Sequence, residues 1–148
     1  MSEWNFQDRV HVSFAANSVA EVALARPDKM NALDTAMFDA LLQAGTLLAG
    51  LHDLRAVVLH GQGRAFCAGL DMGNFAKMAQ GDALSSLADL VPRTHGLANH
   101  AQQVAWQWRE LPVPVVAALQ GVAFGGGLQV ALGEIGRASC RERVSSPV

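Results

Sequence analysis

Apolar and polar residues alternate along two short segments near the start of the chain, Val10–Phe14 and Val19–Ala25. A period of two is typical of β-strands that have one buried and one exposed face. The residues between the segments, Ala-Ala-Asn-Ser, suit a turn. The pattern therefore predicts a β-hairpin.

Apolar positions with helical spacing follow a loop of sequence RPDKMNAL (26–33). Asp34 suits the N-cap of a helix, and the pattern extends from there to about Leu51. The expected buried face consists of Met37, Leu41, Ala44, Leu48 and Leu51.

A second helical pattern spans Leu84–Leu111 and is interrupted by Pro92. Its later apolar stripe consists of Leu97, Ala101, Val104, Trp108 and Leu111.

Two short apolar runs, Ala56–Gly61 and Pro112–Leu119, predict buried strands. A turn containing glycine and a further helix are expected after each run, one helix near Asp71 and the other from about Gly126. Strands that alternate with helices need crossover connections, so we expect one α/β domain.

The composition suits a compact globular protein, since 51% of the 148 residues are hydrophobic and 16% are charged. A formal net charge of -2 provides no basic field for nucleic acid. The segment Leu111–Gly133 has no charged residue, but its prolines, glycines and glutamines suit a membrane-spanning helix poorly. The polar N-terminus does not resemble a signal peptide, and the two cysteines give neither a disulfide framework nor a metal-ligand spacing. We therefore expect no nucleic-acid or membrane partner and a cytoplasmic location.

Two glycine-rich turns could present backbone N–H groups to a ligand. In FCAGLDM (66–72), Gly69 permits a tight turn and Asp71 can cap the next helix, which leaves the Leu70 N–H free. In FGGGLQ (124–129), consecutive glycines let a ligand approach the first free N–H groups of a helix. Each turn alone is more often an ordinary strand–turn–helix junction. Together they could form an oxyanion hole, in which each donor stabilises an oxyanion by roughly 3–4 kcal/mol.

Other catalytic motifs are incomplete. The segment GQGRAF lacks the third glycine of the dinucleotide-binding fingerprint, and no Walker lysine or Gly-x-Ser-x-Gly elbow occurs. Cys67 has no His or Asn partner nearby in its motif, so we expect a small buried hydrophobe rather than a nucleophile.

Three segments, RPDKMNAL, GRAFCAGLDM and PVPVVAALQGVAFGGGLQVALG, resemble in order and spacing the N-terminal signatures of the crotonase (enoyl-CoA hydratase/isomerase) superfamily. The resemblance covers about Val10 to Gly133. It implies a ClpP/crotonase-like ββα spiral core and an acyl-CoA thioester as substrate, with no further cofactor and no metal. It also implies that two backbone N–H groups stabilise a thioester enolate.

By position, the resemblance assigns the two oxyanion-hole N–H groups to Leu70 and Gly126. The CoA and acyl site is then expected to be lined by Lys29, Met30, Ala32, Ala68, Asp71, Met72 and Gly125. Lys29 could instead be a solvated loop charge, and the two methionines could belong to the core.

The chain departs from the hydratases at Gln129, where they have a glutamate three residues after the second oxyanion glycine. An amide cannot exchange a proton near neutral pH, so a single-acid reaction such as double-bond isomerisation fits better than two-acid hydration. Gln129 could orient water or the acyl group. It could equally be an interior helix amide satisfied by its neighbours.

A larger departure begins at Glu134, where an uncharged stretch gives way to the charged tail EIGRASCRERVSSPV. We expect residues 1–133 to be the N-terminal half of a crotonase-like domain, and residues 134–148 to be a non-native segment resembling vector or adapter sequence. The second catalytic acid and the helices that assemble a homotrimer or hexamer would then lie in the missing half. The chain alone is expected to be inactive and prone to aggregate, because a sheet edge and an apolar helix face are exposed. A non-catalytic acyl-CoA-binding or assembly subunit, and an artefact of gene assembly, remain as alternatives.

Overall fold

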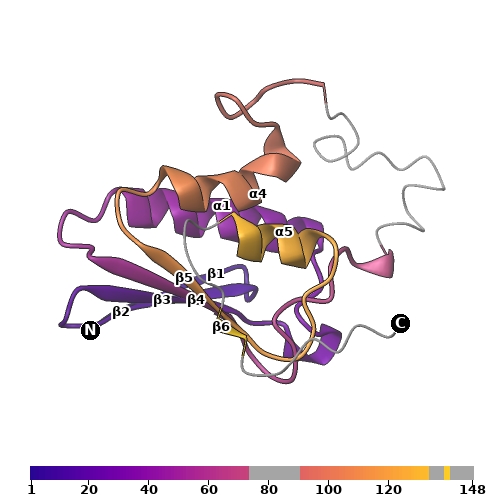
Figure 1. Cartoon of the computed structure of the whole chain (residues 1–148), viewed down its shortest axis with the longest axis horizontal. Helices are drawn as coiled ribbons and strands as arrows, with labels where there is room; N and C mark the ends of the chain where they lie inside the picture. The colour runs from indigo at the N-terminus through magenta and orange to yellow at the C-terminus, as the bar shows by residue number, and fades with distance from the viewer. Residues whose placement is uncertain (74–90, 134–138, 141–148) are drawn as a thin grey trace.

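A computed structural model describes residues 1–73, 91–133 and 139–140, which form a mixed sheet covered by helices on one face (Figure 1). The strands lie side by side in chain order, from β1 to β6. The first three pair antiparallel, and the next three join the sheet in parallel. Their bounds are β1 (Ser2–Phe6), β2 (Val10–Phe14), β3 (Val19–Leu24), β4 (Ala56–Gly61), β5 (Val115–Leu119) and β6 (Ser139–Cys140).

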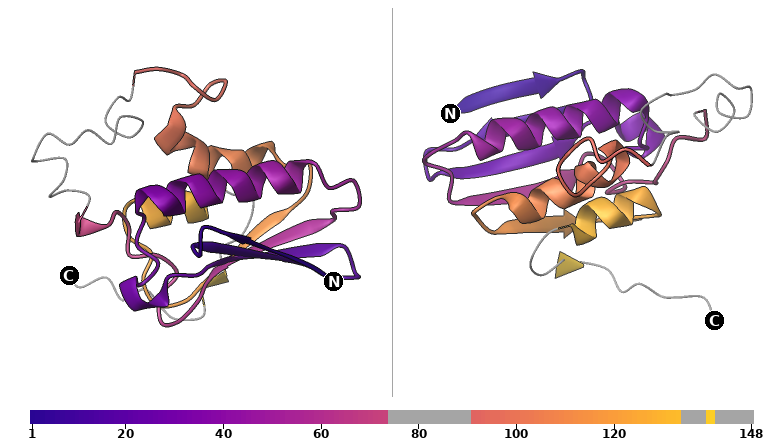
Figure 2. Two further views of the ribbon diagram at one scale, coloured as in Figure 1. Left: turned by 180° about the vertical axis from the view of Figure 1, so that it is seen from behind. Right: turned by 90° about the horizontal axis from the view of Figure 1, so that it is seen from above.

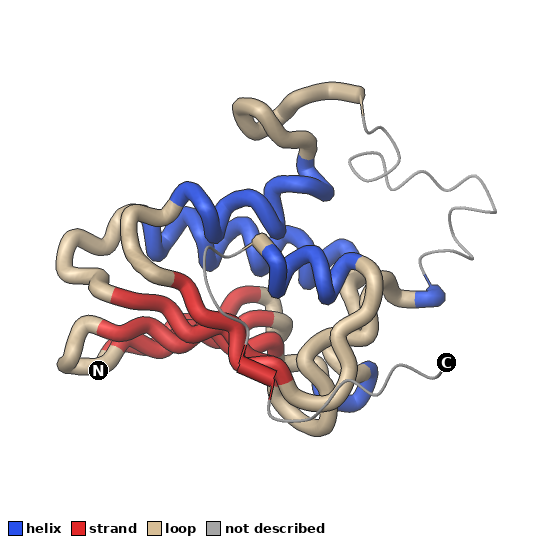
Figure 3. The backbone as a smooth tube through the Cα atoms, viewed as in Figure 1, coloured by secondary structure: helices blue, strands red, loops and turns tan. Residues whose placement is uncertain are grey.

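The α-helices α1, α4 and α5 lie over the same face of the sheet (Figures 1 and 2). In the tube view they form one blue layer above the red strands (Figure 3). Helix α4 packs against both α1 and α5. Burying one large aliphatic or aromatic side chain stabilises a fold by about 1.5–3 kcal/mol, so the core between the sheet and the helices is the main source of the domain's stability. The helix bounds are η1 (Pro27–Lys29), α1 (Thr35–Ala49), α4 (His100–Glu110) and α5 (Gly126–Leu132).

The predicted hairpin is confirmed as β2 and β3, with Val12 opposite Val22 in the register. Both valines are buried under the helices, whereas Glu21 is exposed. The sequence analysis missed β1, which pairs with β2 at the edge of the sheet. Trp4 and Phe6 alternate with exposed Glu3 and Asn5 and pack partly against the core, but two apolar residues are too short a pattern to predict a strand.

Helix α1 begins as predicted, because a carboxylate oxygen of Asp34 accepts the Met37 N–H at 2.8 Å. The predicted apolar face is buried from Met37 to Leu48. The helix ends at Ala49, so Leu51 packs against the core from the following turn.

The helix predicted over Leu84–Leu111 is corrected by the structure. Residues 84–90 lie outside the described residues, and residues 91–99 form turns and bends rather than helix. Helix α4 starts only after Asn99, which forms a capping box with Gln102. Leu97 is therefore 84% exposed and does not belong to a buried stripe. The Asn-x-x-Gln pattern was the available signal for this helix start.

The strand predicted over Pro112–Leu119 is confirmed as β5, and it lies between β4 and β6. Strand β6 pairs with β5 only at Ala118 and Leu119. None of the helices in the described parts of the chain has the length and apolar character needed to cross a membrane.

Candidate active site

The two predicted backbone sites lie next to each other. Strands β4 and β5 are parallel neighbours, so the loops after them leave the same edge of the sheet, where ligands of α/β folds bind. Backbone hydrogen bonds join the loops directly, and two of them surround Cys67. The Cys67 N–H donates to the Val122 carbonyl at 3.1 Å, and the Phe124 N–H donates to the Cys67 carbonyl at 3.0 Å. The structure therefore brings together the two turns that the sequence analysis selected.

The backbone around Leu70 is held by Leu33. The Leu33 N–H donates to the Gly69 carbonyl at 2.7 Å, and the Asp71 N–H donates to the Leu33 carbonyl at 3.0 Å. The Leu70 N–H lies between these two bonded groups and has no hydrogen-bond partner among the described residues. Leu70 itself is exposed.

The second donor is at the start of helix α5. The Gly127 N–H donates to the Phe124 carbonyl and the Gln129 N–H to the Gly125 carbonyl, whereas the Gly126 N–H has no partner within the described parts of the chain. Gly125 has a φ of 47° and a ψ of -117°, a conformation that suits glycine. A Cβ on Gly127 would lie 2.7 Å from the Cys67 carbonyl oxygen, so this position must also remain glycine.

Leu33 links the two donors in space. Its backbone pairs with Leu70, and its Cδ1 atom lies 2.8 Å from the point where a Cβ on Gly126 would stand. Both unpartnered N–H groups thus belong to residues adjacent to Leu33, one beside its backbone and the other beside its side chain.

The loop at residues 27–33 lies beside the first donor. The Ala68 N–H donates to the Met30 carbonyl at 2.9 Å, which joins two of the predicted binding residues. Ala32 is buried, Met30 is half-buried, and Lys29 is exposed at the end of η1. Their roles in binding CoA stay predictions.

Asp71 and Met72 differ sharply in their surroundings. One carboxylate oxygen of Asp71 accepts the Gly73 N–H at 2.8 Å, as expected for a helix cap, and the other contacts the Arg26 guanidinium at 2.6 Å. The Gly73 N–H and Arg26 lower the pKa of Asp71 below its usual value. Met72 is 76% exposed, so its interpretation as a core residue is wrong.

Asn31 and Arg26 were missed by the sequence analysis. Asn31 is fully buried, and its amide nitrogen lies within hydrogen-bond distance of the carbonyls of Gln62, Ala65 and Phe66. Its amide oxygen accepts the Arg26 N–H at 2.8 Å. A polar loop sequence gives no sign that one of its amides is buried, although the positive φ of 54° suits asparagine.

Cys67 is buried, as predicted. Burial raises the pKa of its thiol, and the sulfur contacts the Asn31 carbonyl oxygen at 3.1 Å. This environment favours the neutral thiol, so it supports a structural role.

Gln129 lies one turn beyond Gly126 on α5, about 4.5 Å along the helix axis. Its side chain is exposed, so the alternative of an interior amide is wrong. It borders a hollow of about 550 Å³ between α4 and α5. The remaining lining is mainly apolar and includes Leu97, Ala98, Ala105, Trp106 and Leu132.

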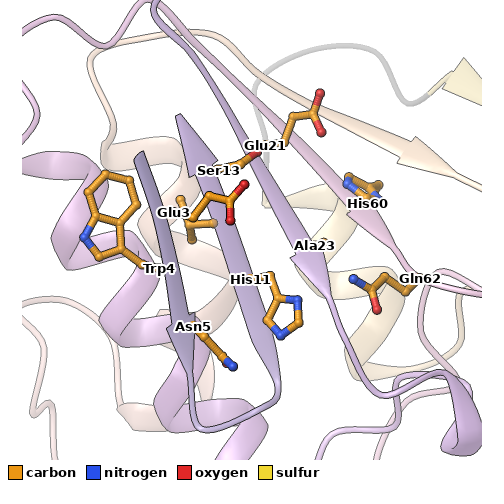
Figure 4. Close-up of a pocket in the computed structure, with 10 residues that line it drawn as sticks. Glu3, Trp4, Asn5, His11, Ser13, Glu21, Ala23, His60 and Gln62 are labelled. Atoms are coloured by element: carbon orange, nitrogen blue, oxygen red, sulfur yellow. The ribbon is translucent and has the colours of Figure 1, made fainter. Parts of the chain in front are cut away.

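A second hollow, of about 500 Å³, lies on the strands β1 to β4 and contains none of the predicted site residues (Figure 4). Most of the residues that line it are polar, and His11 and His60 lie on either side of Ala23. In the described part of the chain, no three histidine, cysteine or acidic residues are grouped to hold a metal ion. The backbone donors at the loop junction therefore remain the best candidate for chemistry.

A sequence model of the enoyl-CoA hydratase/isomerase family matches residues 15–133. The chain belongs to this family. Among curated relatives, it is 38% identical over 132 residues to a probable enoyl-CoA hydratase, echA6, of Mycobacterium bovis, covering 89% of this chain and 45% of the relative. It is 31% identical over 134 residues to a mitochondrial Delta(3,5)-Delta(2,4)-dienoyl-CoA isomerase of Rattus norvegicus, covering 88% of this chain and 39% of the relative.

Solved structures of the same family share the fold. A putative enoyl-CoA hydratase from Streptomyces coelicolor superimposes with a TM-score of 0.70 at 36% identity, covering 85% of this chain and 43% of the other. A putative enoyl-CoA hydratase/isomerase from Mycobacterium abscessus gives a TM-score of 0.72 at 34% identity, covering 84% of this chain and 45% of the other. The α/β crotonase fold is thereby confirmed. This enoyl-CoA hydratase/isomerase family chain spans less than half the length of these relatives.

Proposed function

We propose that the chain is part of an enzyme that acts on acyl-CoA thioesters, with the Leu70 and Gly126 N–H groups as its oxyanion hole. The observation that carries this proposal is that both N–H groups lack partners in the described residues and flank the same residue, Leu33. Two fixed donors at a thioester oxygen polarise the carbonyl, lower the pKa of the α-proton and stabilise the enolate that forms. The CoA thioester is the substrate, and the proposal requires no further cofactor.

The surroundings of the donors suit the two ends of such a substrate. Lys29 is exposed on the loop beside Leu70, where its ammonium group could contact a CoA phosphate. The apolar hollow beside Gln129 could receive an acyl group whose carbonyl is bound at Gly126. Met30, Ala32, Ala68, Asp71, Met72 and Gly125 complete the proposed site.

The amide at Gln129 shifts the proposed chemistry away from two-acid hydration. It has no proton to exchange near neutral pH, but it can donate a hydrogen bond to water or to the acyl group. We therefore favour double-bond isomerisation of an enoyl-CoA over its hydration, with the acid–base group supplied from outside residues 1–133. On this basis, the chain alone binds the thioester but does not turn it over.

The same proposal extends to the whole protein. The family match ends at Gly133, which supports a boundary there and a non-native segment at 134–148. A whole protein of the family would form a homotrimer or hexamer in the cytoplasm. Genomic sequence across the junction of Gly133 and Glu134 tests the boundary, because a continuous native reading frame into the tail would contradict it.

Amide resonances of the chain test the oxyanion hole directly. Addition of a 2-enoyl-CoA should move the amide proton resonances of Leu70 and Gly126 downfield, because each becomes a donor to the thioester oxygen. Free CoA lacks that oxygen and serves as the control. Failure of the thioester to bind, or saturation that leaves both resonances in place, would refute the proposal.

Two substitutions at one position separate the N–H group from the side chain. Gly126→Pro removes the donor at the first helical position, where proline is tolerated. Gly126→Ala adds a Cβ against Leu33 and keeps the donor. In the whole enzyme, Gly126→Pro should lower kcat by about 100-fold or more, because an oxyanion donor is lost. Gly126→Ala, which keeps the donor, should not show this loss.

An acyl-CoA-binding subunit without catalysis is the second candidate, and the exposed amide at Gln129 favours it. Exchange of the α-proton of a bound acyl-CoA with solvent deuterium distinguishes the two. An enzyme of the proposed type exchanges this proton once its acid–base group is present, whereas a subunit that only binds does not.

A further inference from the structure

Arg26 occupies a junction of three oxygen atoms at the end of β3. Its guanidinium Nη1 atom lies 2.6 Å from Asp71 Oδ2, 3.1 Å from the Ala32 carbonyl oxygen and 3.3 Å from Asp34 Oδ2. The side chains of Arg26 and Asp71 are only 15% and 20% exposed. Charge-assisted hydrogen bonds of this length, shielded from solvent, fix the direction of both groups more strongly than a surface pair does.

The position of this pair relative to the Leu70 peptide is specific. Ala32 immediately precedes Leu33 in the chain, and Asp71 immediately follows Leu70. Leu33 is joined to Gly69 and to Asp71 by backbone hydrogen bonds. Arg26 therefore bonds to both of the paired segments, to one through the Ala32 carbonyl and to the other through the Asp71 carboxylate. The side-chain clamp and the two backbone bonds together leave little freedom for the intervening Leu70 peptide plane.

We propose that Arg26 and Asp71 are positioning residues that aim the Leu70 N–H at the thioester oxygen. This inference rests on the proposed function, since it assigns a purpose to the direction of a donor in that oxyanion hole. In this role Asp71 acts through the adjoining Leu70 peptide, and Arg26 acts through Asp71, so the substrate contact assigned to Asp71 above is not required for it. The lowered pKa of Asp71 agrees with a carboxylate that stays ionised in this contact at neutral pH.

A matched arginine on the same cluster allows a controlled test. Arg9 contacts Asp34 through its Nη2 atom at 3.0 Å, and within the described residues it forms no hydrogen bond or ion pair with Leu70, Asp71 or Gly73. Arg9→Gln thus removes the same charge from the cluster but leaves the clamp on Leu70 intact. Arg26→Gln removes the clamp, and Asp71→Asn removes its charge while keeping an oxygen for the Gly73 N–H.

Infrared spectroscopy of a bound 2-enoyl-CoA labelled with ¹³C at the thioester carbonyl reports how strongly the oxyanion hole polarises that bond. In the unaltered chain, the carbonyl stretch should move to lower wavenumber on binding. At saturating ligand, Arg26→Gln and Asp71→Asn should lose most of that displacement, and Arg9→Gln should retain it. Arg26→Lys should restore part of it, because an ammonium group can still reach one of the oxygens. Circular dichroism establishes that each variant is folded.

The outcomes separate the two proposals. If the unaltered chain shows no displacement, the oxyanion hole itself is wrong and the positioning role fails with it. If the displacement persists in a folded Asp71→Asn variant, or falls equally in Arg9→Gln, the positioning role fails while the oxyanion hole stands. Asp71→Asn decides the question even if Arg26→Gln does not fold, since it keeps the shape of the side chain.

Discussion

Replacement of Asn31 by alanine should be among the most damaging single substitutions in the chain. The buried amide has two N–H hydrogens for the carbonyls of the loop after β4 and an oxygen for the Arg26 N–H. Leaving a buried polar group without its partner costs about 1–3 kcal/mol, so three such losses amount to at least about 3 kcal/mol. The left-handed backbone at Asn31 adds to this cost, because alanine adopts it less readily than asparagine.

The free energy of unfolding in urea, followed by circular dichroism, measures this effect. A loss of at least about 3 kcal/mol is a large part of the 5–15 kcal/mol typical of a domain. Asn31→Gly tolerates the left-handed backbone, so its difference from Asn31→Ala isolates the backbone contribution. Asn17→Ala is the matched control, since its exposed side chain accepts the Val19 N–H and forms no other hydrogen bond with the described residues. We expect a change within about 0.5 kcal/mol. A loss below about 1 kcal/mol at Asn31 would refute the reasoning.

Three further predictions concern the neighbouring residues. Gly127→Ala should destabilise the fold by about 1–3 kcal/mol, because the new methyl group would overlap the backbone of Cys67. Urea unfolding measures this loss of stability, and Gly50→Ala, whose methyl group would meet only ordinary contacts, should not show it. Iodoacetamide should modify Cys67 far more slowly in the native chain than in urea, because burial shields the thiol and raises its pKa; equal rates by mass spectrometry would contradict this. The stability advantage of the unaltered chain over Asp71→Asn should be full above the unfolded aspartate pKa of about 3.9 and should shrink as the pH falls through the lowered folded pKa. An advantage that grows in acid, measured by urea unfolding at a series of pH values, would show that the carboxylate is not stabilised in its charged form.

The elements that the sequence predicted well are those with a sustained apolar period. Helix α1 and strands β2 to β5 each bury one face or both, so the periodicity was visible without the structure. Strand β1 was missed because its alternation contains only two apolar residues, Trp4 and Phe6. The true start of α4 was missed because a capping residue depends on local hydrogen bonds more than on apolar spacing.

The candidate site divides in the same way. The two glycine-rich turns could be selected from the sequence, since each follows a buried strand, and the resemblance to the crotonase family assigned the donors within them to Leu70 and Gly126. The contact of Arg26 with Asp71 could not, because the two residues are 45 positions apart and meet only after β3 and β4 have paired. The burial of Asn31 likewise follows from the packing of two loops, which no local pattern encodes.

The short pairing of β6 with β5 affects the tendency of this chain to self-associate in solution. Within the described residues, β5 meets β6 only at Ala118 and Leu119, so the outer backbone groups of Val115–Ala117 have no strand beside them. Such an edge accepts an extended segment of any nearby chain. Self-association should therefore increase with protein concentration, and the melting temperature should vary with dilution. A peptide that occupies the edge should suppress this dependence, so a peptide screen offers a practical route to a monodisperse sample.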